Sequence, residues 1–165
     1  MKTQFRKLNQ GFTIIEVLIV LAIAGLILAI VFLAVPALQR SSRNTAIKSD
    51  SANLLAAVND YISNNSGALP TLPVTQQTGP VICFGTAAVA PCAASESEAK
   101  VRGGTTTTLI IGACGGAPAA LGQIDVHTGC KCSTNVLSVL GARALAAQFL
   151  IEGNSGGPTG QCIDS

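Results

Sequence analysis

The chain contains no tryptophan, one tyrosine, one methionine and one histidine among its 165 residues. Charged residues are also scarce, at 11%, and the net charge is only +2. So small a positive charge gives no reason to expect nucleic acid as a partner, because neutralising phosphates takes clustered lysines and arginines. A single histidine also leaves little material for histidine-based catalysis or metal binding.

Apolar residues are plentiful, at 48%, but many of them lie before residue 39. The length is that of one domain, and the rest of the chain can form only a modest hydrophobic core. Six cysteines lie in this later part, and a small exported domain often compensates for a small core with disulfides.

The N-terminus combines a basic head with a long apolar run. Lys2, Arg6 and Lys7 carry +3, so the rest of the chain sums to −1. From Val17 to Val35 no side chain is polar, and a helix over this run covers ~28 Å, close to the ~30 Å hydrocarbon core of a bilayer. The pattern predicts a transmembrane helix.

A cleaved secretory peptide is the alternative, because Ala22-Ile23-Ala24 resembles a small-x-small cleavage site. Cleavage there would leave a new N-terminus made of the second half of the apolar run. The unbroken run therefore favours a helix that is retained.

Glu16 stands near the start of this run. A carboxylate near a helix end can reach the headgroup layer, which is the simpler interpretation. Carboxylates in membrane segments are usually paired, however, and the apolar stripe offers no cation. The second interpretation is that Glu16 has a cationic partner from outside this helix.

Lys7, the segment Gly11-Phe12-Thr13-Ile14-Ile15-Glu16 and the apolar run resemble the class III leader of type IV pilins and their pseudopilin relatives. The resemblance implies cleavage after Gly11 by a membrane-embedded prepilin peptidase and N-methylation of the new first residue, Phe12. It also implies that Glu16 pairs with the N-terminal amine of a neighbouring subunit. The amine is mostly cationic at neutral pH, and methylation keeps its charge.

This resemblance implies further partners and a location. The partners are the membrane, identical or related subunits in a helical polymer, and a pilus or secretion assembly platform. The prepilin is expected in the cytoplasmic membrane as a single-pass protein with a cytoplasmic N-terminus. The assembled subunit is expected in an extracellular surface filament. The segments implied are a cleaved leader (1–11), a transmembrane and assembly helix (12–38), an amphipathic helix half (39–64) and a β-rich head with disulfides (65–165).

Two residues in the helix have special backbone properties. Gly25 stands where the family often has a glycine, and Leu33 occupies the position of the proline that many type IV pilins carry. Pro36 removes a backbone donor and predicts a kink near Val35. The Gly25–Pro36 stretch is a candidate for local melting in a filament, or Pro36 simply marks the exit from the bilayer.

After Pro36 the pattern is amphipathic, which predicts one helix from Thr13 to Ser63 with its second half on the head. The apolar stripe consists of Ile47, Leu54, Leu55, Val58, Tyr61 and Ile62, and the charges Arg40, Arg43, Lys48, Asp50 and Asp60 fall elsewhere. Gly67 is available for a left-handed cap.

The expected fold is α+β and pilin-like, with a small antiparallel sheet against the long helix. Short β-branched runs bounded by Gly or Pro predict strands at Val81–Phe84, Thr107–Ile111 and Gln123–His127. Between Asn135 and Glu152 the pattern is ambiguous, and it favours a helix or loop followed by a strand from Ala146 to Glu152.

An even number of cysteines after an exporting helix predicts disulfides, but six cysteines allow fifteen pairings. They are Cys83, Cys92, Cys114, Cys130, Cys132 and Cys162. A Cys83–Cys92 bridge would close a short loop. The resemblance to pilins, which often staple the C-terminal region, favours Cys162 paired with Cys114, Cys130 or Cys132.

Two chemical alternatives receive little support. His127-x-x-Cys130-x-Cys132 could hold zinc, but the spacing is not a usual zinc pattern, so no metal or cofactor is expected. The segment around Ser155 resembles the nucleophile segment of chymotrypsin-like proteases, with Asp125 and His127 upstream. The residue order is wrong for that family and the chain has no room for two barrels, so no catalytic activity is expected.

The favoured function is therefore a structural subunit of a type IV pilus-like filament. The alternatives are a pseudopilin of a type II secretion system and a single-pass anchored binding domain that does not polymerise.

Overall fold

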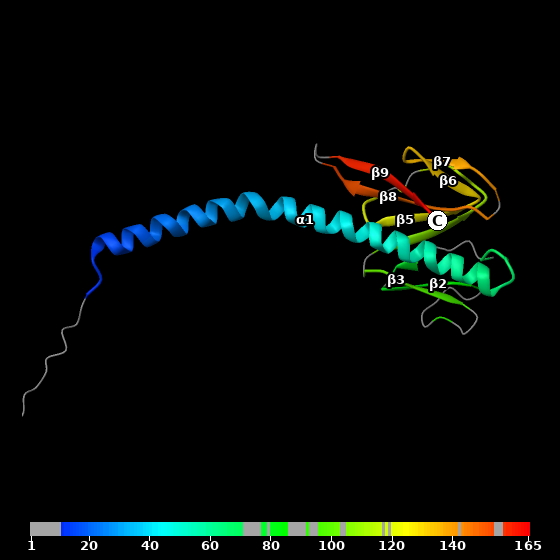
Figure 1. Cartoon of the computed structure of the whole chain (residues 1–165), viewed down its shortest axis with the longest axis horizontal. Coiled ribbons are helices and arrows are strands. Elements are labelled where there is room, and N and C mark those ends of the chain that lie inside the picture. Colours follow the sequence, from blue (N-terminus) through cyan, green and yellow to red (C-terminus); the bar gives the residue numbers. More distant parts are fainter. Residues whose placement is uncertain are drawn as a thin grey trace, which may run out of the picture. The chain divides into compact units, whose positions relative to one another are not determined.

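The computed structural model describes residues 11–70, 77–78, 80–85, 92, 96–102, 105–116, 118, 120–141, 143–153 and 157–165. Its elements are α1 (Ile14–Asn64), β1 (Gln77–Thr78), β2 (Val81–Phe84), β3 (Ser97–Lys100), β4 (Thr106–Ile111), β5 (Gln123–Thr128), β6 (Cys130–Ser133), β7 (Val136–Val139), β8 (Leu145–Glu152) and β9 (Pro158–Asp164). Two compact units divide the chain, Met1–Arg40 and Ser41–Ser165, and α1 contributes to both. The prediction of an α+β, pilin-like fold is confirmed (Figure 1).

The second half of α1 packs on the sheet of the Ser41–Ser165 unit and forms the main hydrophobic core. The predicted stripe is confirmed, since five of its members are buried and Ile62 is partly buried. From the sheet, Leu109, Ile124, Val126, Leu145, Ala147 and Phe149 pack in the same cluster. Three- and four-residue spacing brought these helix residues to one face, as the sequence predicted.

Asp50 is an exception to the predicted polar face, because it is only 6% exposed. Its Oδ2 accepts hydrogen bonds from the Arg102 backbone N–H and the Thr105 hydroxyl, each at 3.4 Å, and lies 3.6 Å from Arg102 Nε. A buried carboxylate needs such partners. They come from a segment far away in the sequence, so helical spacing alone could not reveal them.

The end of α1 is a Schellman cap. The Gly67 N–H donates to Ile62 O at 2.8 Å, and both Ser66 (φ 56°) and Gly67 (φ 86°) are left-handed. This bond pattern places Ser66 at the position directly after the helix. The left-handed backbone expected for Gly67 is present, but it begins one residue earlier.

The main sheet has five strands in the order β1-β4-β5-β8-β9. It is not wholly antiparallel as expected, because β4 and β5 pair in parallel, with Thr108 beside Asp125. A parallel pair needs a crossover of about a dozen residues, and the segment 112–122 provides it. The predicted strands at β2, β4, β5 and β8 are confirmed.

The β6–β7 hairpin corrects the expectation of a helix or loop after Asn135. The loop Thr134–Asn135 joins the strands, and both residues have positive φ, 47° and 64°. Such a two-residue turn matches the twist of a hairpin, but its first position usually holds Asn, Asp or Gly. Threonine at that position therefore hid the turn from sequence analysis.

A side-chain clasp joins α1 to the end of β8. Asn44 Nδ2 donates to Glu152 O at 3.0 Å, and the Glu152 N–H donates to Asn44 Oδ1 at 2.9 Å. Arg43 donates to both carboxylate oxygens of Glu152, at 2.5 and 2.8 Å, and these hydrogen bonds raise the pKa of Arg43. The clasp fixes where the helix enters the core.

Replacing Asn44 with alanine should lower the free energy of unfolding by about 1–2 kcal/mol, because two backbone groups of Glu152 lose their partner. Unfolding in urea can be followed by fluorescence of Tyr61, the single tyrosine, which is 7% exposed in a chain without tryptophan. Asn59→Ala, at an exposed position of the same helix, is the control and should lose nothing. Equal stability of the two variants would contradict a role for the clasp.

Replacing Thr134 with asparagine should raise the free energy of unfolding by about 0.5–1 kcal/mol, because a β-branched residue is strained at positive φ and asparagine tolerates it. The same urea titration measures the change. Thr134→Val keeps the branch and should give no gain, whereas a gain from both variants would show that strain is not the cause.

Candidate functional site at the start of the long helix

Thr13 and Glu16 form a capping box at the first turn of α1. The Thr13 N–H donates to Glu16 Oε2 at 2.9 Å, and the Thr13 hydroxyl donates to the same oxygen at 2.6 Å. The Glu16 N–H lies 3.4 Å from Thr13 Oγ1. This reciprocal arrangement satisfies donors that a helix start leaves unpaired. The Thr-x-x-Glu spacing is a known signal for it, and sequence analysis overlooked it.

The capping box changes the interpretation of Glu16. Whether or not a cationic partner from outside the helix exists, its carboxylate already bonds within its own first turn through Thr13. Both of these bonds end on Oε2. The structure of a single chain does not test whether Glu16 pairs with the amine of another copy, so this pairing stays a prediction.

The residues before the helix are accessible. Phe12 is 89% exposed, and Gly11 is exposed as well. A Cβ built on Gly11 meets no atom within 4 Å, and Gly11 is not among the residues with positive φ. Glycine is therefore not required here by the fold, which leaves recognition from outside as a reason for it. Lys7 lies outside the described residues.

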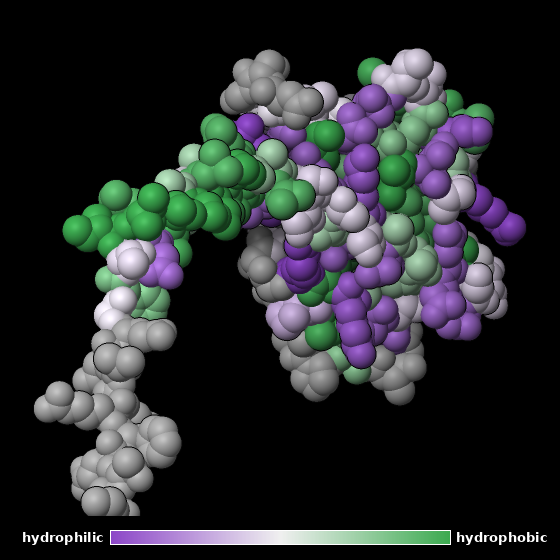
Figure 2. All heavy atoms as spheres, turned by 60° about the vertical axis from the view of Figure 1, so that its left-hand side comes forward, coloured by the Kyte–Doolittle hydropathy of each residue, from purple (hydrophilic) through white to green (hydrophobic). Residues whose placement is uncertain are grey.

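The first part of α1 is apolar on all sides and unburied. Every residue from 11 to 40 is exposed, and no side chain from Val17 to Val35 is polar. Figure 2 shows this part as a nearly continuous apolar surface in green. By length and composition α1 is able to span a membrane, and it is the one described helix that is.

Gly25 and Pro36 do not interrupt the helix, which runs unbroken through both. Pro36 lacks the N–H that would bond to Phe32 O. A Cβ on Gly25 would meet nothing outside the neighbouring helix backbone. Local melting of this stretch stays a prediction.

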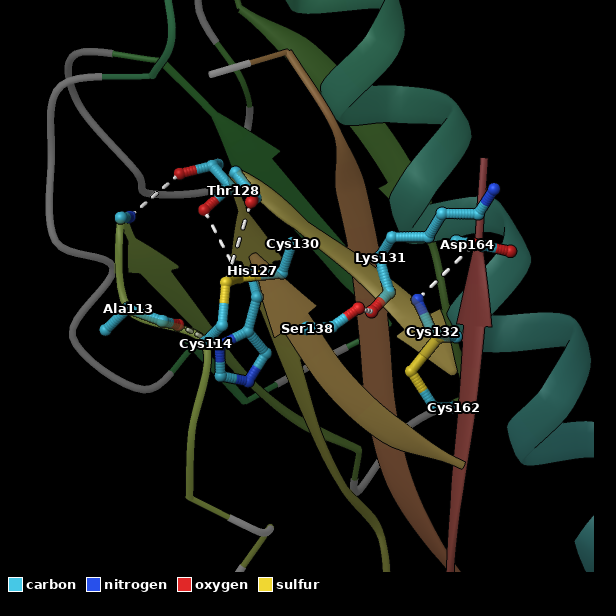
Figure 3. The surroundings of a disulfide bond; sticks show 12 residues. Ala113, Cys114, His127, Thr128, Cys130, Lys131, Cys132, Ser138, Cys162 and Asp164 are labelled. Atoms are coloured by element: carbon cyan, nitrogen blue, oxygen red, sulfur yellow. Dashed lines mark hydrogen bonds between the residues drawn. A yellow bond between two sulfur atoms is a disulfide. The ribbon is translucent and has the colours of Figure 1, made fainter. Parts of the chain in front are cut away.

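Three disulfides tie the second unit together: Cys83–Cys92, Cys114–Cys130 and Cys132–Cys162. The partner of Cys162 is one of the three that the resemblance left open. The bridges at Cys130 and Cys132 start from residues two apart on β6 and therefore hold the same face of the strand; Figure 3 shows both. The Cys132 N–H also donates to Asp164 Oδ2 at 3.3 Å.

The residues of the possible zinc motif have other partners. Cys130 and Cys132 each belong to a disulfide, so neither offers a thiolate. His127 is fully buried, and its Nδ1 lies 2.8 Å from Ala113 O (Figure 3). Because a carbonyl only accepts, Nδ1 carries the hydrogen. A zinc site at this motif would first require reduction of both disulfides.

The protease-like residues are only partly described. Asp125 and His127 lie two residues apart on β5, and both are buried. Asp125 Oδ1 accepts a hydrogen bond from Gln123 Nε2 at 2.9 Å. Ser155 lies outside the described residues, so the arrangement of the three is not tested.

Comparison with known proteins identifies the N-terminal segment. Residues 6–32 match the family model described as the prokaryotic N-terminal methylation motif. No curated protein and no solved structure matches the chain. The matched region contains Gly11, Phe12, Thr13 and Glu16, which are the residues of the site.

Replacing Thr13 with alanine should loosen the first turn of α1, because an N-cap hydroxyl contributes about 0.5–2 kcal/mol. Hydrogen exchange in detergent micelles should show faster exchange at the Glu16 and Val17 amides. Thr13→Ser keeps the hydroxyl and should exchange like the original chain. Unchanged exchange in the alanine variant would mean that the capping box does not form.

Proposed function

Because the chain carries the N-terminal methylation segment of a type IV pilin-like prepilin, we propose that it is the structural subunit of a pilus-like filament. The prepilin is inserted in the membrane, cleaved between Gly11 and Phe12, and methylated on Phe12. The mature subunit then polymerises through the first part of α1. Cleavage and methylation are then carried out by the processing enzyme, and the chain itself only binds other subunits.

The observation that carries the proposal is the exposed apolar surface of residues 11–40. Removing such surface from water is worth roughly 25 cal/mol per Å², so the segment is unstable in water without a cover. Lipid covers it in the prepilin. Helices of other subunits cover it in a filament, and a bundle of apolar helices is stable in water because each hides the surface of its neighbours.

Lipid and a helix bundle are nearly equally apolar, so apolar burial alone favours neither state. A polar interaction that forms only in the bundle can decide between them. We assign this role to Glu16 and the amine of Phe12 in a neighbouring subunit. A charge at the centre of a membrane costs about 2.5–3.5 kcal/mol. Glu16 lies near the helix start, where the cost is smaller, and pairing lowers it further.

The processing and location follow from the same proposal. A prepilin peptidase in the membrane recognises the leader, and an assembly platform extracts the mature subunit. The Ser41–Ser165 unit, with its three disulfides, lies on the side where thiols are oxidised. After assembly, this unit lies on the surface of the filament. We assign the chain no catalytic activity.

Replacing Glu16 with alanine should leave membrane insertion intact, because it makes the stem, residues 11–40, more apolar. Filament yield should fall severalfold or more, since the neighbouring amine would be buried without its counter-charge. Shearing, electron microscopy and immunoblotting measure the yield. Glu98→Ala, which removes an exposed carboxylate of the other unit, is the matched control and should assemble normally.

Sequencing the N-terminus of the membrane-bound and sheared material separates the remaining possibilities. Methylated Phe12 in sheared filaments supports the proposal. An intact leader in a monomeric envelope protein would instead favour a non-polymerising anchored domain. Normal filament yield from Glu16→Ala would contradict the role of the ion pair.

A further inference from the structure

The β6–β7 hairpin exposes three apolar side chains close together in the sequence. Val136 is 64% exposed, Val139 is 80% exposed and Leu140 is 65% exposed. Leu137, between them, is buried beneath the hairpin, at 9%. The strand is therefore anchored through one side chain and presents the others to the surroundings.

The hydrogen-bond phase of the hairpin shows which backbone groups point outward. In a two-residue hairpin the residues next to the turn, Ser133 and Val136, form a hydrogen-bonded pair, and such pairs alternate along the strands. The Leu140 N–H donates to Gly129 O at 3.0 Å, which agrees with this phase. The N–H and C=O groups of Leu137 and Val139 thus face away from β6.

Within the part of the chain that the structure describes, no strand pairs with this outer edge, since β7 pairs only with β6. The segment Val136–Leu140 reads VLSVL and contains no charge or proline. Natural edge strands usually carry such residues to prevent pairing with other chains. This edge has the opposite composition, which suits it to pairing.

The edge is also held in place. Disulfides fix Cys130 and Cys132 of β6, so the hairpin is tied both to Cys114 and to Cys162 of β9. A strand that is already ordered loses little conformational entropy when it pairs with another. The hairpin is therefore suited to bind an extended strand along β7.

We propose that β7 pairs antiparallel with β7 of a second copy of this chain, about a two-fold axis at Ser138. In this register Leu137 of each copy faces Val139 of the other, and their outward N–H and C=O groups form the new ladder. Val136 of each copy lies opposite Leu140 of the other. All three exposed apolar side chains thus gain an apolar neighbour.

Charge does not oppose this pairing. The nearest cation on the hairpin is Lys131 of β6, which lies opposite Ser138 of β7. Across the four-stranded assembly the two copies of Lys131 lie three strand spacings apart, ~14 Å, which exceeds the ~8–10 Å Debye length at physiological salt. The same uncharged sequence on both sides favours a second copy over a charged partner.

This contact is closed by its two-fold symmetry, so it cannot be the head-to-tail contact that extends a helical filament. It would link copies laterally, between two filaments or between two anchored subunits. The inference therefore goes beyond the proposed function and does not depend on it. Filaments can form without the contact, and the contact can form without filaments.

The test uses the full-length chain in detergent micelles, with a photoreactive phenylalanine analogue in place of Val136. Irradiation should give a covalent dimer, and tryptic mapping should place the cross-link at Leu140 in the second copy. Amide exchange at Leu137 and Val139 should slow as the protein concentration rises.

Two substitutions at Val139 distinguish this contact from association through the stem helix. Val139→Lys places a charge at the pairing edge and should reduce the cross-linked dimer by about tenfold or more. Val139→Thr keeps the branched shape and should retain it. Both variants leave residues 11–40 unchanged, so association through this part of α1 is the same in the two. A difference in cross-linked dimer between them therefore reports on the β7 contact.

Any of three cross-linking outcomes would overturn the inference. They are no cross-link from position 136, a cross-link that maps away from the β7 segment, and equal dimer from the lysine and threonine variants. Negative-stain microscopy adds an independent measurement if filaments form. Val139→Lys should then yield separate filaments of normal length where the original chain yields laterally associated ones, and unchanged lateral association would also overturn it.

Discussion

The exposed apolar surface of residues 11–40 is the constraint on which the other features depend. No side chain of this segment is buried, so the rest of the chain must fold without its help. The core of the Ser41–Ser165 unit therefore comes from the second half of α1, the five-stranded sheet and the β2–β3 pair, which adds Ile82, Phe84 and Ala99. A core of this size is marginal, and three disulfides together with the Asn44–Glu152 clasp supply additional constraint.

The features that the sequence predicted well are those set by neighbouring residues. The extent of α1 follows from the apolar run, the amphipathic spacing after Pro36 and the stop near Gly67, all of which act within a few residues. The Thr13–Glu16 capping box is equally local, but sequence analysis overlooked it. The strands β2, β4 and β5 are short β-branched runs bounded by turn residues, so they were predictable too. The methylation segment at residues 6–32 is also a local pattern.

The errors concern pairings between distant residues and the strands that were not predicted, which are β1, β3, β6, β7 and β9. The parallel β4–β5 pair depends on the path of the segment 112–122, which spacing alone does not define. Asp50 appeared to belong to the polar face because Arg102 and Thr105 are remote in sequence. The β7 strand was missed for a different reason, since Thr134 occupies a left-handed position that threonine rarely adopts. Prediction was thus limited by non-local contacts and by strained turns. The apolar pattern of the sequence was not a source of error.

The capping box at Thr13 also bears on how Glu16 could serve two roles. A carboxylate has two oxygens that together accept about four hydrogen bonds. Both bonds from Thr13 end on Oε2, and among the described residues none ends on Oε1. An amine from a neighbouring subunit could therefore bond to Oε1 while the cap stays in place. Capping would orient the carboxylate before assembly and reduce the entropy lost when the ion pair forms. Once cleavage has freed the amine of Phe12, the pairing of subunits requires no rearrangement of the first helical turn.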